Sequence, residues 1–129
     1  ILVVFNAEGD QPDHADRAAR CGTALIREAD RVAAGHPGWP RFRVGIATGP
    51  AAVGTVGAGS RRSFATIGDT TNLASRLMSL AEPGQVVIGP ETRAALGGDG
   101  LSLVPLGSRQ VKGKREPVET WAVDPAAAP

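Results

Sequence analysis

The segment 67–76, Ile-Gly-Asp-Thr-Thr-Asn-Leu-Ala-Ser-Arg, carries the pair of side chains with the clearest capacity for chemistry. The Gly68-Asp69 turn signal predicts that a helix begins there, which puts Asn72 and Arg76 one turn apart on one face. An amide and a planar guanidinium presented together suit a sugar hydroxyl and a phosphate. The alternative is that both are solvated residues of an ordinary surface helix.

Further polar residues accompany this pair. Asp69 is a candidate metal ligand, but the residues around it favour a turn and a helix cap. Lys112, Lys114 and Arg115 form a small basic cluster. Such a cluster is commonly the solvated tip of a hairpin, and a nucleic-acid surface needs more charge and interleaved aromatic residues.

The elements that must position these residues follow from apolar periodicity and turn signals. Residues 1–5 form an uninterrupted apolar run, which predicts a buried strand. A long helix is expected from Asp13 to Gly35, and the apolar residues predicted to form its buried face are Ala15, Ala18, Gly22, Leu25, Ala29 and Val32. Cys21, beside Gly22, is expected to pack.

The rest of the chain predicts further strands and two shorter helices. Residues 41–48 alternate as a strand, and residues 51–56 are expected to return as its hairpin partner. Helices are expected after Gly68, with Leu73, Leu77 and Leu80 on the buried face, and over residues 90–96. The remaining expected strands span residues 61–67, 85–88, 101–106, 109–112 and 119–123.

This order of elements predicts an α/β sandwich of the α+β kind, with a mixed sheet flanked by helices. The 129 residues suffice for one domain with a real core. We expect that domain to span residues 1–123 and the Ala/Pro-rich residues 124–129 to form a flexible tail.

Composition excludes several classes of protein. The formal net charge of +1 gives no argument for a nucleic-acid partner, and no apolar run approaches the roughly 20 residues of a membrane-spanning helix. The single cysteine cannot form an internal disulfide, which favours a reducing cytoplasm. The two histidines lack metal-ligand spacing, and no phosphate-binding glycine-rich loop is present.

Five segments in order resemble the catalytic domain of class III nucleotidyl cyclases, which make cyclic AMP or cyclic GMP from the triphosphate. They are residues 44–50 (Val-Gly-Ile-Ala-Thr-Gly-Pro), 54–63, 64–76, 83–88 (Pro-Gly-Gln-Val-Val-Ile) and 111–114 (Val-Lys-Gly-Lys). Residues 54–63 resemble the hairpin arm of the family, and residues 111–114 resemble its phosphate-binding hairpin. The resemblance implies a ferredoxin-like mixed sheet, truncated at its N-terminus. It also implies an intracellular signalling enzyme whose substrate is ATP or, as the second choice, GTP.

The resemblance also implies roles for individual residues. Asn72 would align the ribose so that its 3′-oxygen faces the α-phosphate, and Arg76 would neutralise the charge that grows on that phosphate. Lys112 would hold the β- and γ-phosphates that leave as pyrophosphate. Ala65 occupies the position that helps choose the purine, where the family usually has a polar residue. Thr66, next to it, would point to the opposite face of its strand.

The metal ligands of the family are expected outside this chain. The family binds two Mg²⁺ or Mn²⁺ ions through two aspartates, and both positions would precede Ile1. In the family, one subunit supplies the aspartates and its partner supplies the Asn/Arg pair. We therefore expect a second cyclase subunit as partner and no activity from this chain alone. The alternative is a degenerate cyclase-like module that dimerises or binds nucleotide without catalysis.

Overall fold

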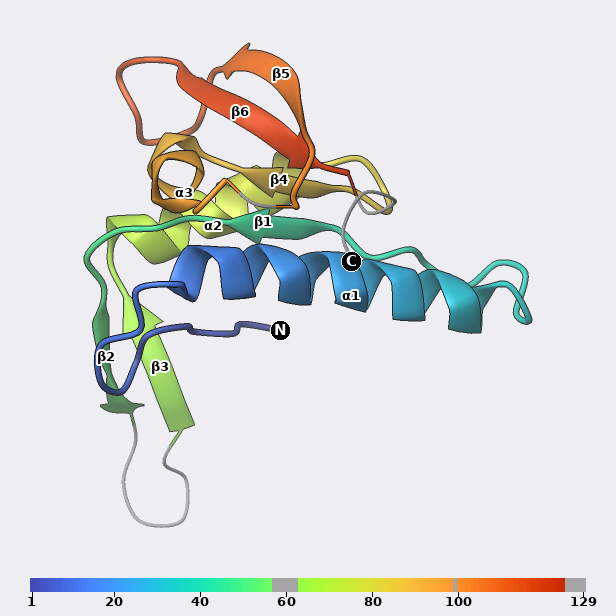
Figure 1. Cartoon of the computed structure of the whole chain (residues 1–129), viewed down its shortest axis with the longest axis horizontal. Helices are drawn as coiled ribbons and strands as arrows, with labels where there is room; N and C mark the ends of the chain where they lie inside the picture. The colour runs from blue at the N-terminus through green and yellow to red at the C-terminus, as the bar shows by residue number, and fades with distance from the viewer. Residues whose placement is uncertain (57–62, 99, 125–129) are drawn as a thin grey trace.

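The computed structural model describes residues 1–56, 63–98 and 100–124, with only the backbone described for 53–56 and 63–67. Most of the predicted hairpin arm (57–62) and of the predicted tail (125–129) therefore lies outside the described residues. Its helices are α1 (His14–Ala33), α2 (Asp69–Leu80) and α3 (Pro90–Ala95). Its strands are β1 (Val44–Ile46), β2 (Ala52–Val56), β3 (Ser63–Ile67), β4 (Val86–Ile88), β5 (Leu103–Arg109) and β6 (Val118–Val123) (Figure 1).

The main sheet has four strands in the order β1-β4-β6-β5. Strands β1 and β4 are parallel, with Val44 opposite Val86, and β6 is antiparallel to both β4 and β5. Strands β2 and β3 form a separate antiparallel ribbon that projects away from the main sheet (Figure 1). This arrangement confirms the predicted fold class, a mixed sheet with flanking helices.

Helices α1 and α2 pack against opposite faces of the sheet. Side chains alternate between the two faces along a strand, so Val86 and Ile88 share a buried cluster with Ile26 of α1. Val87, between them, belongs to a second cluster that includes Leu77 of α2. Strand β4 is therefore buried on both faces and forms the middle layer of the molecule.

Gly45 of β1 allows α2 to approach the sheet closely. A Cβ built on Gly45 would lie 2.3 Å from the carbonyl oxygen of Ala74 and 2.3 Å from the amide nitrogen of Met78. Both are backbone atoms of α2, so a side chain cannot be accommodated by a rotamer change. The absence of a side chain on Gly45 thus sets the distance between α2 and the sheet.

The apolar N-terminal run is not a buried strand, and this prediction was wrong. Residues 1–5 belong to no strand of the described structure, and Ile1, Leu2 and Val3 are exposed. Residues with high β-propensity form a strand only when another strand pairs with them. In the described part of the chain, β1 is an edge strand of the main sheet, and this segment does not pair with it.

Several of the predicted strands have different bounds or partners. Strand β1 covers only Val44–Ile46, and it pairs with β4, whereas β2 pairs with β3. Residues 109–112 do not form a strand of their own, because Arg109 ends β5 and the following residues form a turn. Strands β5 and β6 therefore form an antiparallel hairpin, and residues 110–117 connect them.

The buried face of α1 is rotated relative to the prediction. The buried residues are Ala15, Ala19, Gly22, Thr23 and Ile26. Leu25 and Val32, which were predicted to be buried, are exposed, as is Cys21. A Cβ built on Gly22 would lie 3.3 Å from side-chain atoms of Val44 and Val86, so contact with β1 and β4 sets the buried face.

Among the described residues, none of the helices combines the length and apolarity that crossing a membrane demands.

Candidate functional site

Helix α2 carries the predicted Asn/Arg pair at the surface. Strand β3 ends at Ile67, and Gly68, whose φ of 136° favours glycine, is the N-cap of the helix. The amide of Asn72 donates to the carbonyl oxygen of Gly68 at 3.1 Å, which closes the first turn. The helix therefore begins where the Gly-Asp signal predicted.

The buried residues of α2 decide which side of the helix faces solvent. Leu73 and Leu77 are the buried residues of α2, and both belong to the cluster beneath the helix. Asn72 and Arg76 each precede one of these leucines, and both are exposed. Burial of the leucines thus holds the Asn/Arg pair along one edge of the helix.

A turn after β5 forms the opposite wall of the site. Val111 is buried in the same cluster as Leu73 and Leu77, which fixes this turn against α2. The amide of Lys114 donates to the carbonyl oxygen of Val111 at 3.1 Å, and the Gln110 side-chain amide donates to the carbonyl oxygen of Lys114 at 3.2 Å. The turn is therefore closed by its own hydrogen bonds.

These two walls enclose a small cavity of about 180 Å³. Its lining residues come from α2 and from the turn after β5, and they are Asp69, Asn72, Leu73, Arg76, Val111, Lys112, Gly113 and Lys114. The cations Arg76, Lys112 and Lys114 outnumber the one carboxylate, so the cavity suits an anion. Pockets that enclose a whole small molecule measure about 300–1,000 Å³, so this cavity suits part of a larger ligand.

The structure thus brings together three of the predicted site residues. Asn72, Arg76 and Lys112 line the same cavity, although about 30 residues of sequence separate the end of the helix from the turn. Ala65 and Thr66 lie on β3, paired with Gly54 and Val53 of β2. The side chains of Ala65 and Thr66 lie outside the described part of the structure.

Two further charged residues, Asp69 and Lys114, line the cavity without having been predicted as site residues. Asp69 was interpreted as a helix cap, but Gly68 is the N-cap and Asp69 is the first residue of α2. Lys114 had no role of its own in the prediction, although it belongs to the segment 111–114 that resembles the phosphate-binding hairpin of the family, and it lines the cavity with Lys112. The Lys-Gly-Lys spacing was the available signal, because a turn at the intervening glycine can direct both lysines to one side.

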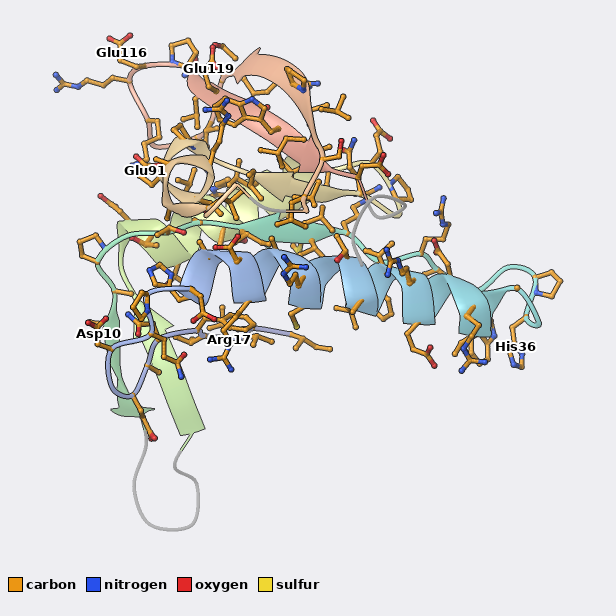
Figure 2. All side chains as sticks on the ribbon, in the orientation of Figure 1. Asp10, Arg17, His36, Glu91, Glu116 and Glu119 are labelled. Atoms are coloured by element: carbon orange, nitrogen blue, oxygen red, sulfur yellow. The ribbon has the colours of Figure 1, made fainter. Side chains whose placement is uncertain are left out.

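The carboxylates of the described residues do not form a metal centre. No group of three or more His, Cys, Asp or Glu residues in the described chain is placed to hold a metal ion. Glu91, Glu116 and Glu119 are exposed, and Figure 2 shows their side chains directed outward. A divalent ion needs several oxygen ligands, so the described residues alone do not fit one.

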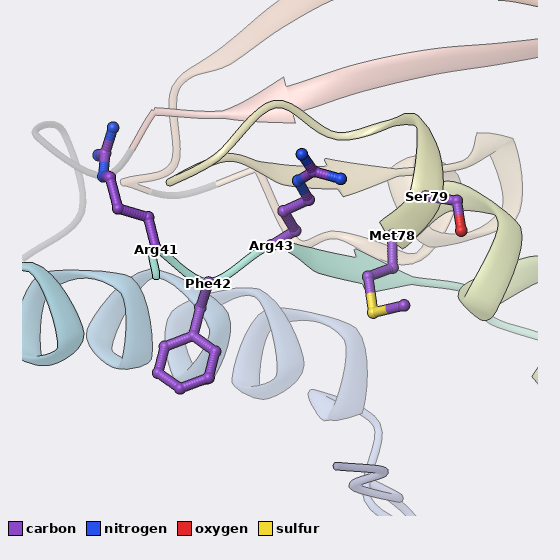
Figure 3. Close-up of a pocket in the computed structure, with 5 residues that line it drawn as sticks. All are labelled: Arg41, Phe42, Arg43, Met78 and Ser79. Atoms are coloured by element: carbon purple, nitrogen blue, oxygen red, sulfur yellow. The ribbon is translucent and has the colours of Figure 1, made fainter. Parts of the chain in front are cut away.

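A second, larger hollow of about 410 Å³ lies at the start of β1 and is lined by Arg41, Phe42, Arg43, Met78 and Ser79. Figure 3 shows Phe42 directed to the side of its segment opposite Arg41 and Arg43. Arg41 donates to both carboxylate oxygens of Asp30, at 3.2 and 3.0 Å. These hydrogen bonds lower the pKa of Asp30 and raise that of Arg41. The hollow lacks an amide or a lysine, so the smaller cavity remains the candidate site.

Comparisons with known proteins identify the family of the chain. The family model "Adenylate and Guanylate cyclase catalytic domain" matches residues 2–125. The chain is 34% identical over 128 residues to adenylate cyclase 1 of Rhizobium meliloti, an alignment that covers 95% of this chain and 19% of that protein.

Two solved structures are also similar. The adenylyl cyclase CyaB of P. aeruginosa aligns with a TM-score of 0.80 and 31% identity, covering 93% of this chain and 64% of that one. The guanylate cyclase domain of RhGC from Catenaria anguillulae, solved in complex with GTP, aligns with a TM-score of 0.76 and 26% identity, again covering 93% and 64%. The chain thus spans about a fifth of the curated relative and about two-thirds of each solved chain.

Proposed function

We propose, since this chain belongs to the adenylate and guanylate cyclase catalytic domain family, that its cavity binds the sugar and phosphates of a nucleoside triphosphate during cyclisation. The reaction joins the 3′-oxygen of the ribose to the α-phosphorus and releases pyrophosphate. The observation that carries the proposal is the shared cavity of Asn72, Arg76 and Lys112. An amide, a guanidinium and an ammonium are the groups that a ribose followed by a phosphate chain requires.

Asn72 is assigned to the ribose. Its side-chain amide can donate to one sugar oxygen and accept from a hydroxyl, so it can fix the orientation of the ring. The attack needs the 3′-oxygen in line with the bond that breaks, about 3–3.5 Å from the α-phosphorus. Asn72 therefore acts by orienting the ribose, and its loss should lower kcat by a larger factor than the factor by which it raises KM.

Arg76 is assigned to the α-phosphate. Phosphoryl transfer is catalysed mostly by positioning and by stabilising charge on the phosphate oxygens. The guanidinium lies one helical turn from Asn72, so it can contact the phosphate that follows the sugar. Its planar donors suit two oxygens of that phosphate at once.

Lys112 is assigned to the β- and γ-phosphates, and we extend this role to Lys114. Both lysines come from the wall opposite α2 and line the same cavity. An ammonium group is a compact charge that can follow a leaving group as it separates. Two lysines can share the charge of pyrophosphate, so the phosphate chain runs from α2 toward the turn after β5.

The second subunit and the metal ligands are part of the proposal. The cavity is small and its polar side chains are exposed, so a second cyclase subunit is assigned to cover the remaining surface of the nucleotide. We assign the ligands of Mg²⁺ or Mn²⁺ to residues outside this chain, because its described residues form no such group. When bound, these ions stabilise charge on the attacking and leaving oxygens.

We propose ATP as the substrate, with GTP as the second choice. Ala65, at the position assigned to purine selection, cannot form a hydrogen bond through its side chain. Thr66 is the nearest polar residue in the sequence of β3. The known relatives include both adenylate and guanylate cyclases, so parallel assays with ATP and GTP decide this point.

The test of the proposed function uses the full-length protein that contains these residues. Purified wild type is assayed for cyclic AMP and cyclic GMP with Mg²⁺ and with Mn²⁺. Arg76→Ala should lower the rate by about 10²-fold or more, because it removes a preorganised donor to the reacting phosphate. A rate within twofold of wild type would refute the role of Arg76.

A matched control separates this effect from a general change in charge. Arg43→Ala removes another exposed arginine. Arg43 lies at the start of β1, where it lines the larger hollow and not the cavity that holds Arg76. We expect this variant to keep the wild-type rate. An equal loss in both arginine variants would contradict a specific contact between Arg76 and the phosphate.

A degenerate module that binds nucleotide without converting it is the second candidate, and Ala65 is the residue that favours it. Such a module would produce no cyclic nucleotide under any metal condition, but ATP would still raise its melting temperature. A wild-type protein that makes no cyclic nucleotide but melts at a higher temperature with ATP would support this second candidate. A protein that neither reacts nor shifts would exclude both candidates.

A further inference from the structure

A hydrogen bond joins the first turn of α2 to the segment that leads into β2, at the base of the β2–β3 ribbon. The Thr70 hydroxyl donates to the carbonyl oxygen of Pro50 at 2.6 Å. Pro50 precedes β2, and Thr70 follows β3, so this contact closes the base of the ribbon. The contact links the start of α2 to a segment outside the helix.

Gly49 makes this contact sterically possible. A Cβ built on Gly49 would lie 2.8 Å from the hydroxyl oxygen of Thr70, with the Thr70 methyl carbon also nearby at 3.7 Å. The side chain of Thr70 therefore occupies the space that a side chain on Gly49 would take. Its hydroxyl is held between the Gly49 backbone and the Pro50 carbonyl group, which restricts its position.

The buried anchors of α2 begin only after Asn72. Leu73 is 8% exposed and Leu77 is fully buried, so burial holds the helix from its second turn onward. Arg76 lies between these two leucines, whereas Asn72 precedes both. The backbone of Arg76 is thus fixed by the core, and the position of Asn72 depends more on how the first turn is held.

We propose that Thr70 is a positioning residue that acts through Asn72, a role that rests on the function proposed above. Its hydrogen bond to Pro50 fixes the first turn of α2 against the base of the ribbon. That contact sets the direction from which the Asn72 amide enters the cavity. Thr70 does not line the cavity, so its effect on the reaction passes through the backbone.

Loss of the Thr70 contact should change the orientation of the ribose 3′-oxygen rather than the affinity for the nucleotide. A shift of the Asn72 amide changes the in-line geometry of the 3′-oxygen, while the cations of the cavity still hold the phosphates. In the full-length protein, Thr70→Val, which keeps the shape and removes the hydroxyl, should lower kcat about tenfold and change KM by less than about twofold. Thr70→Ser, which keeps the hydroxyl, should retain kcat within about twofold.

Double variants test whether the effect passes through Asn72. In an Asn72→Ala background, Thr70→Val should cause little further loss of kcat, because the residue that it positions is already absent. In an Arg76→Ala background, the same substitution should still lower kcat about tenfold. Equal losses in the two backgrounds would overturn the proposal, as would equal losses in Thr70→Val and Thr70→Ser.

A hydroxyl of the same helix provides the control. The Ser79 hydroxyl donates to the carbonyl oxygen of Ser75 at 3.1 Å, a bond that lies within α2 and ties it to no other element. We expect Ser79→Ala to keep both kcat and KM of wild type. A loss in Ser79→Ala equal to that in Thr70→Val would show a general sensitivity of α2 and overturn the assignment.

Amide exchange tests the structural step without any need for activity. The amide of Asn72 is hydrogen-bonded to Gly68 in the first turn, so Thr70→Val should speed its exchange about fivefold, and Thr70→Ser should not. Amides near the buried Leu77 should be unaffected in both variants. An unchanged Asn72 amide would overturn the proposal. An inactive wild type would refute the proposed function alone, and the exchange result would still decide the role of Thr70 in the helix.

Discussion

Replacing Gly45 with alanine should force α2 away from the sheet. The added methyl carbon would lie 2.3 Å from the Ala74 carbonyl oxygen and from the Met78 amide nitrogen, and 2.9 Å from the Met78 Cα. Nonbonded heavy atoms pack at about 3.5–4.0 Å, so the helix has to move by roughly 1 Å or more. The clash involves only helix backbone, which no side-chain rotation can relieve.

Two losses follow from this displacement. Overpacking of this kind costs about 1–3 kcal/mol of folding free energy. The same movement carries Asn72 and Arg76, and it separates them from the lysines of the opposite wall. A displacement of about 1 Å at a reacting centre can cost about 10²-fold in rate, so kcat/KM should fall by that order.

Urea unfolding and steady-state kinetics of the wild type and Gly45→Ala check both losses. Gly89→Ala is the matched control, because its Cβ would lie 3.5 Å from a Leu77 methyl carbon, which is an ordinary contact. Gly89 is the N-cap of α3, where alanine is less favourable than glycine, so the control should lose about 1 kcal/mol or less. A Gly45→Ala protein within about 0.5 kcal/mol of wild type, with unchanged kcat/KM, would refute the close-approach argument.

Two further outcomes are expected. Val111, which is 3% exposed, packs in the cluster beneath α2, so Val111→Ala should lower the free energy of unfolding by about 1–3 kcal/mol. It should also weaken nucleotide binding, because it loosens the turn that carries Lys112. Unfolding curves and ATP titration test both effects, and an unchanged affinity for ATP would contradict the second. The hydrogen bond from Arg41 lowers the folded-state pKa of Asp30, so its stabilising contribution is present above the unfolded-state pKa and is lost as the pH falls through the folded-state value. The stability advantage of wild type over Asp30→Asn should therefore shrink below about pH 4, and an advantage that is independent of pH would contradict this origin.

Local signals in the sequence predicted the helix that carries the site. The Gly68 turn and the spacing of Leu73 and Leu77 specify where α2 begins and which of its sides is buried. That side leaves Asn72 and Arg76 together on the surface, as predicted. These features depend on residues within two helical turns of one another, so a pattern of neighbouring residues is sufficient to predict them.

The pairing of the strands could not be predicted from such local patterns. A hairpin of residues 41–48 with 51–56 was expected from their proximity in sequence, yet β1 pairs with β4. An apolar strand can pair with any neighbour of suitable register, and the choice depends on the packing of the whole sheet. The apolar run at residues 1–5 likewise has strand propensity, but in the described structure it has no strand beside it.

The sequence by itself determined the chemistry of the site: an amide and a guanidinium one turn apart on α2, with two lysines beside a glycine in a distant turn. Only the tertiary structure decided that these groups line one cavity, that Asp69 lines it as well, and that Thr70 joins the helix to Pro50. The physical reason is that side-chain identity and helical spacing are local properties. A cavity between two elements is created by the buried contacts that hold those elements together, here those of Val111 with the leucines of α2.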